Sequence, residues 1–554
     1  MGWNPRTWFS RRTLRKDAVA GLILGVEAVP DGLAAGLLAG VNPLAGLYGY
    51  LFGMVGAAIL TSSAFMAVQA TSAMALVVSD AGLDRLPDPD RGLFTLAILT
   101  GIIMVIAGLL RGGRLISFVP TPVMTGFVTA IGVNIILGQL SNLTGYQAQG
   151  PNRLLKTIDV LVHVGQWSIP SLVVGAISIL VIVVLLPTRV GSVGLVVAVV
   201  LGSLCAVLLN LWVRSDVVLL RDIVEVPRGL PAPVLPDIAD VPDLLIPALS
   251  LTFIGLVQGA AVSAGIPTAD GRRADANRDF LGQGLGNVVS GLFQGMPVGG
   301  SMSGSSLIVQ AGAKTRLSLF IAGAVMAVVV FVAADLVSFV AMPALAGLLI
   351  VVGWRAIKPS RVYSVIRSGL LPTTIMGVTF GLTLIIPLQF AVLVGVGLGV
   401  ILYVAEQSNS VRVRAVHLEQ DGRMREGDPP AVVPPRDVLV LQPYGSLFFA
   451  SAPVFERKLP DVSRESAGSV VIVRLRGTDE IGLSHVDVLR RFASRLRDAG
   501  STLKIVATED RVISQLEAGG LTADIGADNV YRGSEWIGEG LRRAYADARG
   551  EIGR

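Results

Sequence analysis

MPVGGSMSGSS, residues 296–306, is the stretch around which this sequence is best understood. It separates two apolar blocks, GLGNVVSGLF (284–293) and LFIAGAVMAVVVFVA (319–333), and its glycine, serine and proline residues prevent one continuous helix. Irregular backbone at membrane depth is tolerated only where protein buries it or a water-filled cavity wets it. Transporters use such breaks to aim the N–H groups of a half-helix at an anionic ligand. An ordinary extramembrane turn has the same composition, so the rest of the chain must decide.

The composition indicates a membrane protein with many spanning segments. Of 554 residues, 52% are hydrophobic and 15% are charged, and several apolar runs reach roughly 20 residues, the length that spans a bilayer. The single cysteine, Cys205, excludes an intrachain disulfide, and the three histidines are scattered. A net charge of +5 does not indicate a nucleic-acid partner. Because no nucleophile–base set, metal cluster or lysine-containing phosphate loop is present in the sequence, we expect no enzyme and no cofactor.

Fourteen apolar segments are expected to form a transmembrane domain over residues 18–408. They are 18–39, 44–61, 66–82, 93–110, 121–143, 169–187, 192–213, 245–265, 279–295, 303–313, 317–335, 340–356, 371–387 and 390–407. Basic residues fall in every second connection, beginning with a basic N-terminal segment, residues 1–17, whereas the acidic connection 214–243 falls on the other side. By the positive-inside rule the N-terminus is cytoplasmic and the chain spans the cell (cytoplasmic) membrane.

The fourteen segments divide into seven plus seven, which makes the second half an inverted copy of the first. The third segment opens with the polar AFMAVQATS (64–72), and the tenth opens at 303–306 after Gly299 and Gly300. Interrupted segments at equivalent places in two inverted halves are the best sequence indication of a transporter's substrate site.

The composition changes after residue 408. Residues 409–436 are charged and proline-rich and are expected to form a linker or a peripheral strand. Residues 437–554 combine strand-like runs with amphipathic helices, which predicts a soluble α/β domain on the cytoplasmic side. We expect strands at 438–442, 446–450, 469–475 and 502–507, and helices at 453–460, 485–498, 511–518 and 535–547.

Four stretches resemble the sulfate permease (SulP) family of anion transporters in its bacterial form with a C-terminal STAS domain. They are DAVAGLILGVEAVPDGLAAGLLAGVNPLAGLYGY (17–50), TSSAFMAVQATSAMAL (61–76), DANRDFLGQGLGNVVSGLFQGMPVGGSMSGSS (275–306) and VLVLQPYGSLFFASAPVFERKL (438–459). The resemblance implies a core domain and a gate domain, half-helices that meet at mid-membrane, a homodimer and elevator-like alternating access. It also implies a STAS domain open to cytoplasmic protein partners. A uracil/purine permease shares the membrane architecture but lacks the STAS domain.

The two half-helix starts are the expected anion site, because each presents unpaired N–H donors and a partial positive charge. The candidate contacts are Ser303, Gly304 and Ser305 on one side and Gln69, Ala70, Thr71 and Ser72 on the other. Capping of a helix by Ser303 or Ser305 is the structural alternative, and it is compatible with binding. Two positions depart from the family: Gly304 stands where many members have an arginine, and Gln69-Ala70 stands where many have Gly-Pro.

Asp31 is the candidate ion-coupling residue. It follows Pro30 inside the first apolar segment, and a carboxylate at membrane depth marks a transport or proton pathway by default. The resemblance implies proton coupling at this position, whereas a hydrogen bond to a half-helix is the structural alternative. Gln258 stands where many bacterial relatives carry a glutamate, and its neutral amide leaves proton uptake to Asp31. Glu27, four residues before Asp31, is interpreted as structural.

We therefore expect secondary active transport of a small inorganic anion, sulfate first and bicarbonate second, coupled to H⁺ rather than Na⁺. The alternatives are an uncoupled, channel-like anion conductor or exchanger, and a regulatory membrane scaffold that uses its STAS domain. Asp275, Asn277 and Asp279 are expected to be turn and helix-cap residues. Ser484 lies near the position that is phosphorylated in bacterial relatives of the STAS domain, but with Asp487 it fits a capping box better.

Overall fold

The computed structural model describes residues 13–112, 120–150, 153–188, 191, 193–226, 229–266, 274–386, 388–419, 423–534 and 536–552. The chain forms two compact units, Met1–Gly399 and Val400–Arg554. Most of the basic N-terminal segment lies outside the described residues. So do several of the basic residues in the alternate connections, namely Arg114, Arg189, Arg272 and Arg273.

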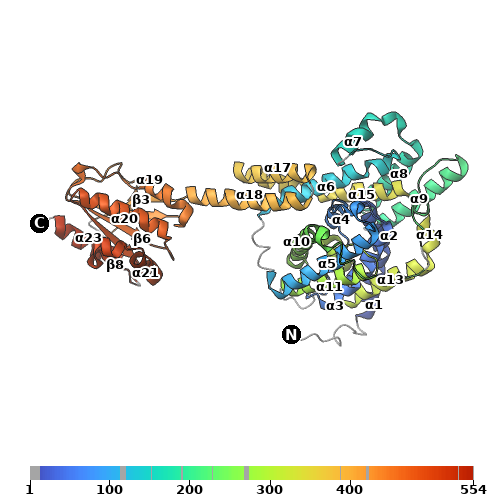
Figure 1. Ribbon diagram of the computed structural model, residues 1–554, viewed down its shortest axis with the longest axis horizontal. Coiled ribbons are helices and arrows are strands. Elements are labelled where there is room, and N and C mark those ends of the chain that lie inside the picture. The colour runs from blue at the N-terminus through green and yellow to red at the C-terminus, as the bar shows by residue number, and fades with distance from the viewer. Residues whose placement is uncertain are drawn as a thin grey trace. The chain divides into compact units, whose positions relative to one another are not determined.

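The first unit is helical, as predicted (Figure 1). Its helices are α1 (Leu14–Ala39), α2 (Pro43–Tyr48), the π-helical η2 (Gly49–Gly53), α3 (Met54–Leu60), α4 (Ser72–Ser79), α5 (Pro89–Leu109), α6 (Thr121–Thr144), α7 (Arg153–Val162), α8 (Ile169–Leu185), α9 (Val193–Trp212), α10 (Val241–Gly265), α11 (Ala276–Leu292), α12 (Met302–Gln310), α13 (Leu317–Val332), α14 (Ala334–Ser338), α15 (Met342–Ala356), α16 (Pro359–Arg367) and α17 (Leu370–Ile385). α18 (Leu388–Asn409) begins in this unit, and its residues from Val400 belong to the second. Each of the fourteen expected segments overlaps helical structure. α7 and α16 are additional, and α14 begins within the segment expected at 317–335 and extends beyond it.

Seven helical stretches in the described part of the chain are long and apolar enough to cross a membrane. They are Leu14–Ala39, Pro43–Leu60, Pro89–Leu109, Thr121–Thr144, Val193–Trp212, Val241–Ser263 and Met342–Arg367. Three shorter apolar helices, Ile169–Leu185, Leu317–Val332 and Leu370–Ile385, accompany them. The stretches expected at 66–82 and 303–313 are short helices preceded by strands, which is the interrupted form that their polar openings predict.

Glycines bring α11 into backbone contact with its neighbours. An added Cβ at Gly284 would lie 2.7 Å from the Gly101 carbonyl oxygen of α5, and one at Gly286 would lie 2.6 Å from the Gly53 carbonyl oxygen. Side chains larger than hydrogen at these positions would therefore push the helices apart. α5 lies along α11 and α1 along α13 (Figure 1).

The second unit contains a six-stranded sheet in the order β4-β3-β5-β6-β7-β8. The strands are β3 (Arg412–Leu418), β4 (Met424–Gly427), β5 (Val438–Tyr444), β6 (Val470–Leu475), β7 (Thr502–Ala507) and β8 (Val530–Arg532). β5 to β8 are parallel, and β3 and β4 pair antiparallel at one edge. The helices are α19 (Ala452–Lys458), α20 (Leu483–Asp498), α21 (Asp510–Ala518), α22 (Leu521–Ile525) and α23 (Glu539–Ile552).

The two faces of this sheet build separate apolar cores. Val471, Val473 and Leu475 point to a core that includes Phe492 of α20. Residues that alternate with them, such as Ile472, pack with α23. This alternation is the period of two expected of a β-strand.

Two expectations for the second unit are wrong, and one open alternative is decided. Of the two alternatives for 409–436, a linker or a peripheral strand, the structure has the peripheral strand, since the stretch contributes β3 and β4 to one edge of the sheet. The strand expected at 446–450 is a loop, because Gly445 turns the chain at a φ of 104° and Ser451 Oγ bonds the Ser446 carbonyl at 2.8 Å. The capping box at Ser484 is wrong: α20 starts at Leu483 after Gly482, so Ser484 already lies inside the first turn.

His485 on α20 makes the second unit sensitive to acid. Its side chain is fully buried, Nε2 lies 3.2 Å from Ser451 Oγ, and burial lowers the pKa of His485 to about 4. The folded unit therefore excludes a proton that the unfolded chain takes up below its ordinary pKa of about 6.5. Stability is complete above that pH and falls as the pH drops towards 4.

We expect the free energy of unfolding of the second unit to fall by about 2 kcal/mol between pH 7.5 and pH 5 because of His485. Scanning calorimetry of the whole chain would measure this as a lower transition temperature for the second unit. His485→Leu should remove this part of the pH dependence. An equally acid-sensitive transition in that variant would contradict the assignment to His485.

Candidate functional site

A row of polar side chains on α11 holds the glycine-rich stretch 296–300. Gln283, Asn287 and Ser290 recur at helical spacing, so they share one face of α11, and all three are fully buried. Asn287 Nδ2 donates to the Val298 carbonyl at 2.7 Å, and its Oδ1 accepts from the Val298 N–H at 2.8 Å. One amide side chain thus satisfies both backbone groups of Val298.

The neighbouring positions of the row complete this support. The Gly300 N–H donates to Gln283 Oε1 at 3.0 Å, and Ser290 Oγ donates to the Met296 carbonyl at 2.7 Å. Backbone groups that a helix would pair internally are thus paired by side chains of a neighbouring helix. This is how an irregular stretch persists inside the helical unit.

The two interrupted segments meet through a short pair of strands. β1 (Ala67–Gln69) and β2 (Gly299–Ser301) are antiparallel, with Ala67 opposite Ser301 and Gln69 opposite Gly299. α4 follows β1 and α12 follows β2, so the two helices begin at opposite ends of the pair. This arrangement agrees with an inverted relation between the two halves.

Each half-helix begins with a hydroxyl cap. Thr71 Oγ1 accepts from the Met74 N–H at 3.4 Å, and Ser301 Oγ accepts from the Gly304 N–H at 3.1 Å. A cap hydroxyl of this kind takes up one amide, and the other N–H groups of the first turn have no partner within the helix. Two sets of amide donors with positive helix ends therefore flank the β1–β2 pair.

Capping by Ser303 or Ser305 is wrong, because α12 starts one residue earlier than the segment expected at 303 and Ser301 is its cap. Ser303 is exposed, and its Oγ lies 3.1 Å from Ser301 Oγ. Ser305 is fully buried, and its Oγ accepts from the Ala67 N–H at 2.9 Å. Ser305 thus connects α12 to β1, whereas Ser303 faces open space at the helix start.

Gln69 and Gly304, the two departures from the family pattern, lie against each other. Gln69 is 2% exposed, and a Cβ added to Gly304 would lie only 2.3 Å from Gln69 Oε1. In the described part of the chain, Gln69 Nε2 is buried and has no hydrogen-bond partner. The glutamine therefore occupies the space that any side chain at 304 would enter, and it brings a free amide donor there.

Gln258 of α10 joins the start of α4. Its Oε1 accepts from Thr71 Oγ1 at 2.9 Å, and a Cβ added to Gly299 would lie 3.2 Å from the same oxygen. Ser72 is half-buried as the first residue of α4, and Ala70 is buried. The structure thus brings Gln258 together with the candidate residues of the third segment.

Asp31 lies half-buried on α1, and its hydrogen-bond partner is the Tyr50 hydroxyl of η2. Glu27, one turn before it, is buried. Tyr50 follows Gly49, and a Cβ added to Gly49 would lie 3.1 Å from the Met296 carbonyl oxygen. The element that holds Asp31 therefore packs directly on the start of the stretch 296–300.

Two buried acidic residues have structural partners that the sequence pattern did not predict. Asp279 is fully buried and accepts from the Ser62 N–H at 2.7 Å and from Ser263 Oγ at 2.5 Å, so it is a cross-link rather than a cap. Asp17 accepts from the N–H groups of Lys314 and Thr315 at 2.6 and 2.9 Å. Asp275 does cap α11, as predicted.

The donors gathered around β1 and β2 are neutral amides and hydroxyls, which suit an anion that must exchange its hydration shell for protein groups. Within the described ranges, no group of three or more histidine, cysteine, aspartate or glutamate residues is placed to hold a metal ion.

Comparisons with known proteins identify the family of the chain. The chain matches the Sulfate permease family over residues 14–379 and the STAS domain over residues 429–535. YbaR of Bacillus subtilis (strain 168), named as a candidate sulfate transporter, is 29% identical over 80% of this chain and 84% of its own. The bicarbonate transporter BicA of Picosynechococcus sp. (strain ATCC 27264 / PCC 7002 / PR-6) is 29% identical over 72% of this chain and 71% of its own.

Solved structures share the fold. The overall structure of SLC26A9 superposes with a TM-score of 0.84 at 19% identity, covering 99% of this chain and 94% of that one. The transmembrane domain of a cyanobacterial BicA superposes with a TM-score of 0.60 at 26% identity, covering 71% of this chain and 98% of that one.

Proposed function

The chain belongs to the Sulfate permease family of anion transporters, and we propose that it moves a small inorganic oxyanion across the cytoplasmic membrane by secondary active transport. Sulfate is the first candidate and bicarbonate the second. The observation that carries this proposal is the β1–β2 pair with the capped starts of α4 and α12 at its two ends.

The proposed anion site holds its ligand by dipoles and neutral donors. Each helix start carries about half an elementary positive charge, and its effect falls off within the first turn. Ser303 and Ser72 supply hydroxyls, whereas the Thr71 hydroxyl already donates to Gln258 Oε1. Gln69 Nε2 supplies N–H groups that have no partner among the described residues. Without a fixed guanidinium, binding relies on partial charges, which favours release as well as capture.

We also propose that protonation of Asp31 accompanies each anion. The support is its half-buried carboxylate, the Tyr50 hydroxyl beside it, and the packing of η2 on the stretch 296–300. A proton taken up with the anion offsets the anion's charge during passage through the membrane. Gln258, whose amide does not titrate, binds Thr71 and would position the start of α4.

The remaining expectations are carried forward as parts of the same proposal. The protein would work as a homodimer with both termini in the cytoplasm, and its STAS domain would meet cytoplasmic protein partners. The basic residues in alternate connections support the orientation.

Ser303→Leu is expected to weaken anion binding about tenfold or more, because it replaces an exposed hydroxyl at the start of α12 by an apolar group that also excludes water. Binding of labelled sulfate and bicarbonate to the purified protein measures the effect, and unlabelled anions in competition rank the ligands. Ser338→Leu, in α14, is the matched control, since α14 belongs to neither half-helix. Wild-type affinity in a folded Ser303→Leu protein would exclude the half-helix site.

A further inference from the structure

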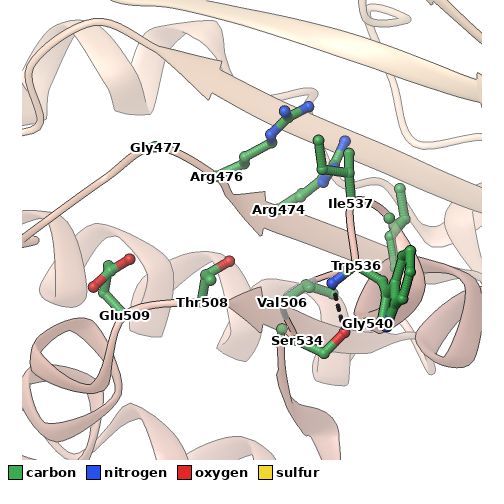
Figure 2. A pocket seen from close by; sticks show the side chains of 13 residues that line it. Arg474, Arg476, Gly477, Val506, Thr508, Glu509, Ser534, Trp536, Ile537 and Gly540 are labelled. Carbon is green, nitrogen blue, oxygen red and sulfur yellow. Dashed lines mark hydrogen bonds between the residues drawn. The ribbon is translucent and has the colours of Figure 1, made fainter.

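The second unit contains a pocket at the carboxyl ends of its parallel strands. Its volume is about 310 Å³, and its walls follow β6, β7 and β8 and include the start of α23 (Figure 2). In open α/β sheets, ligands bind outside the carboxyl ends of the strands. The side chains used below are Arg474, Arg476, Glu509, Ser534, Trp536 and Ile537.

Two arginines form one end of this pocket. Arg474 comes two residues after Ile472 and four after Val470, so it lies on the face of β6 that α23 covers. Although it is charged, it is only 6% exposed. Its guanidinium donates to Gln442 Oε1 at 3.1 Å. Arg476 follows two residues later, and the two side chains lie next to each other in Figure 2. Burial and the neighbouring Arg476 charge lower the pKa of Arg474.

Among the described residues, neither arginine is within ion-pair distance of a carboxylate, and the carboxylate that acts on Arg474 from beyond that distance is Glu426 of β4. A buried guanidinium that contacts no counterion directly is unfavourable. A bound anion would supply the missing charge, and a planar carboxylate or phosphate matches the guanidinium geometry.

The other walls of the pocket indicate the chemistry of the rest of the ligand. Trp536 and Ile537 are 79% and 73% exposed, so large apolar surfaces border the pocket. Ser534 Oγ accepts from the Trp536 N–H at 3.2 Å, the contact drawn in Figure 2. Glu509 lies towards the opposite end from the arginines, so a second anionic group would meet a like charge there.

We propose that this pocket binds a small organic anion, with one phosphate or carboxylate group at Arg474 and Arg476 and an apolar, planar body against Trp536 and Ile537. A bare inorganic oxyanion does not fill it, since pockets of about 300 Å³ and more accommodate organic ligands. The ligand therefore differs in class from the anion proposed for the membrane unit, and this site is independent of that proposal.

Phenyl phosphate is the probe. It is titrated calorimetrically into the full chain in detergent, and inorganic phosphate and phenol, its two halves, are titrated separately. We expect phenyl phosphate to bind at least about tenfold more tightly than either half. Arg476→Gln, at an exposed position, should weaken it about tenfold, and Trp536→Ala should weaken it severalfold. Arg511→Gln is the control, because Arg511 is exposed and pairs with Glu480 outside the pocket lining.

Three results would overturn the proposal. They are absent binding of phenyl phosphate, equal affinity for inorganic phosphate, and an unchanged affinity in Arg476→Gln. Ser303→Leu distinguishes the two proposed anion sites, because it changes only the site in the membrane unit. It should therefore leave phenyl phosphate binding unchanged. A loss in that variant would place the probe in the membrane unit and would equally overturn the proposal.

Discussion

Gly304→Arg, which introduces the arginine that many relatives carry, is expected to lower anion uptake by roughly 100-fold, because overpacking a buried position costs about 1–3 kcal/mol. The first added atom, Cβ, would already lie 2.3 Å from Gln69 Oε1. Since Gln69 is buried in β1, the new side chain would displace either the strand or the start of α12. Uptake of labelled sulfate and bicarbonate into proteoliposomes measures the loss.

The double variant Gln69→Gly with Gly304→Arg tests the physical reason. Removing the glutamine side chain opens the space, so the double variant should recover uptake relative to Gly304→Arg alone. Gly304→Ala and Gly377→Ala form a matched pair, because a Cβ at Gly377 meets no described atom within 4 Å. Only the first is expected to reduce uptake. Equal activity of Gly304→Arg and wild type would show that Gln69 does not constrain position 304.

Much of the membrane fold could be predicted because apolar runs and polar interruptions are visible in the sequence. The openings at 64–72 and 296–306 correspond to β1 and β2 with their following helices. The helices that escaped prediction, such as α7 (RLLKTIDVLV) and α16 (PSRVYSVIR), carry charged residues and are amphipathic, so a search for apolar runs passes over them.

The side chains that hold the candidate site in place could not be predicted, because their role depends on which distant part of the chain folds back against α11. Gln283, Asn287 and Ser290 recur at helical spacing, and that polar row in an apolar segment was the available signal. Nothing in the spacing says that residues 296–300 fold back onto the same face. The contact between Gln69 and Gly304 could not be predicted for the same reason, since the pairing of β1 with β2 brings the two positions together.

Several features of the second unit were not predicted from its sequence. VVIVRL was expected as a strand, but its arginine was not singled out, although a charged residue that continues a buried alternation is unusual. β8 has three residues, too few for a periodic signal. The early start of α20 was missed because Gly482 caps it without a side-chain hydrogen bond.

Proton coupling by Asp31 predicts that Asp31→Asn loses uptake driven by a pH gradient and keeps anion exchange. Asparagine preserves the size of the side chain and a hydrogen-bonding group for the Tyr50 hydroxyl, but it takes up no proton. One pH unit corresponds to 1.36 kcal/mol per proton, so one-to-one symport across such a gradient accumulates the anion about tenfold. The wild type should reach this ratio in proteoliposomes, and the variant should reach none.

Glu27→Gln is the control for this experiment, because Glu27 is a buried carboxylate one turn away on the same helix and has no assigned role in coupling. It should retain accumulation in response to the pH gradient. A sodium gradient imposed at equal pH distinguishes the two candidate ions and is expected to drive no uptake.

Full pH-driven accumulation by Asp31→Asn would exclude Asp31 as the proton carrier. Loss of pH-driven accumulation in Glu27→Gln alone would transfer the role to Glu27. If exchange were also lost in Asp31→Asn, the carboxylate would be needed to hold η2 against the stretch 296–300 rather than to carry a proton. The two parts of the measurement, accumulation and exchange, therefore separate coupling from architecture.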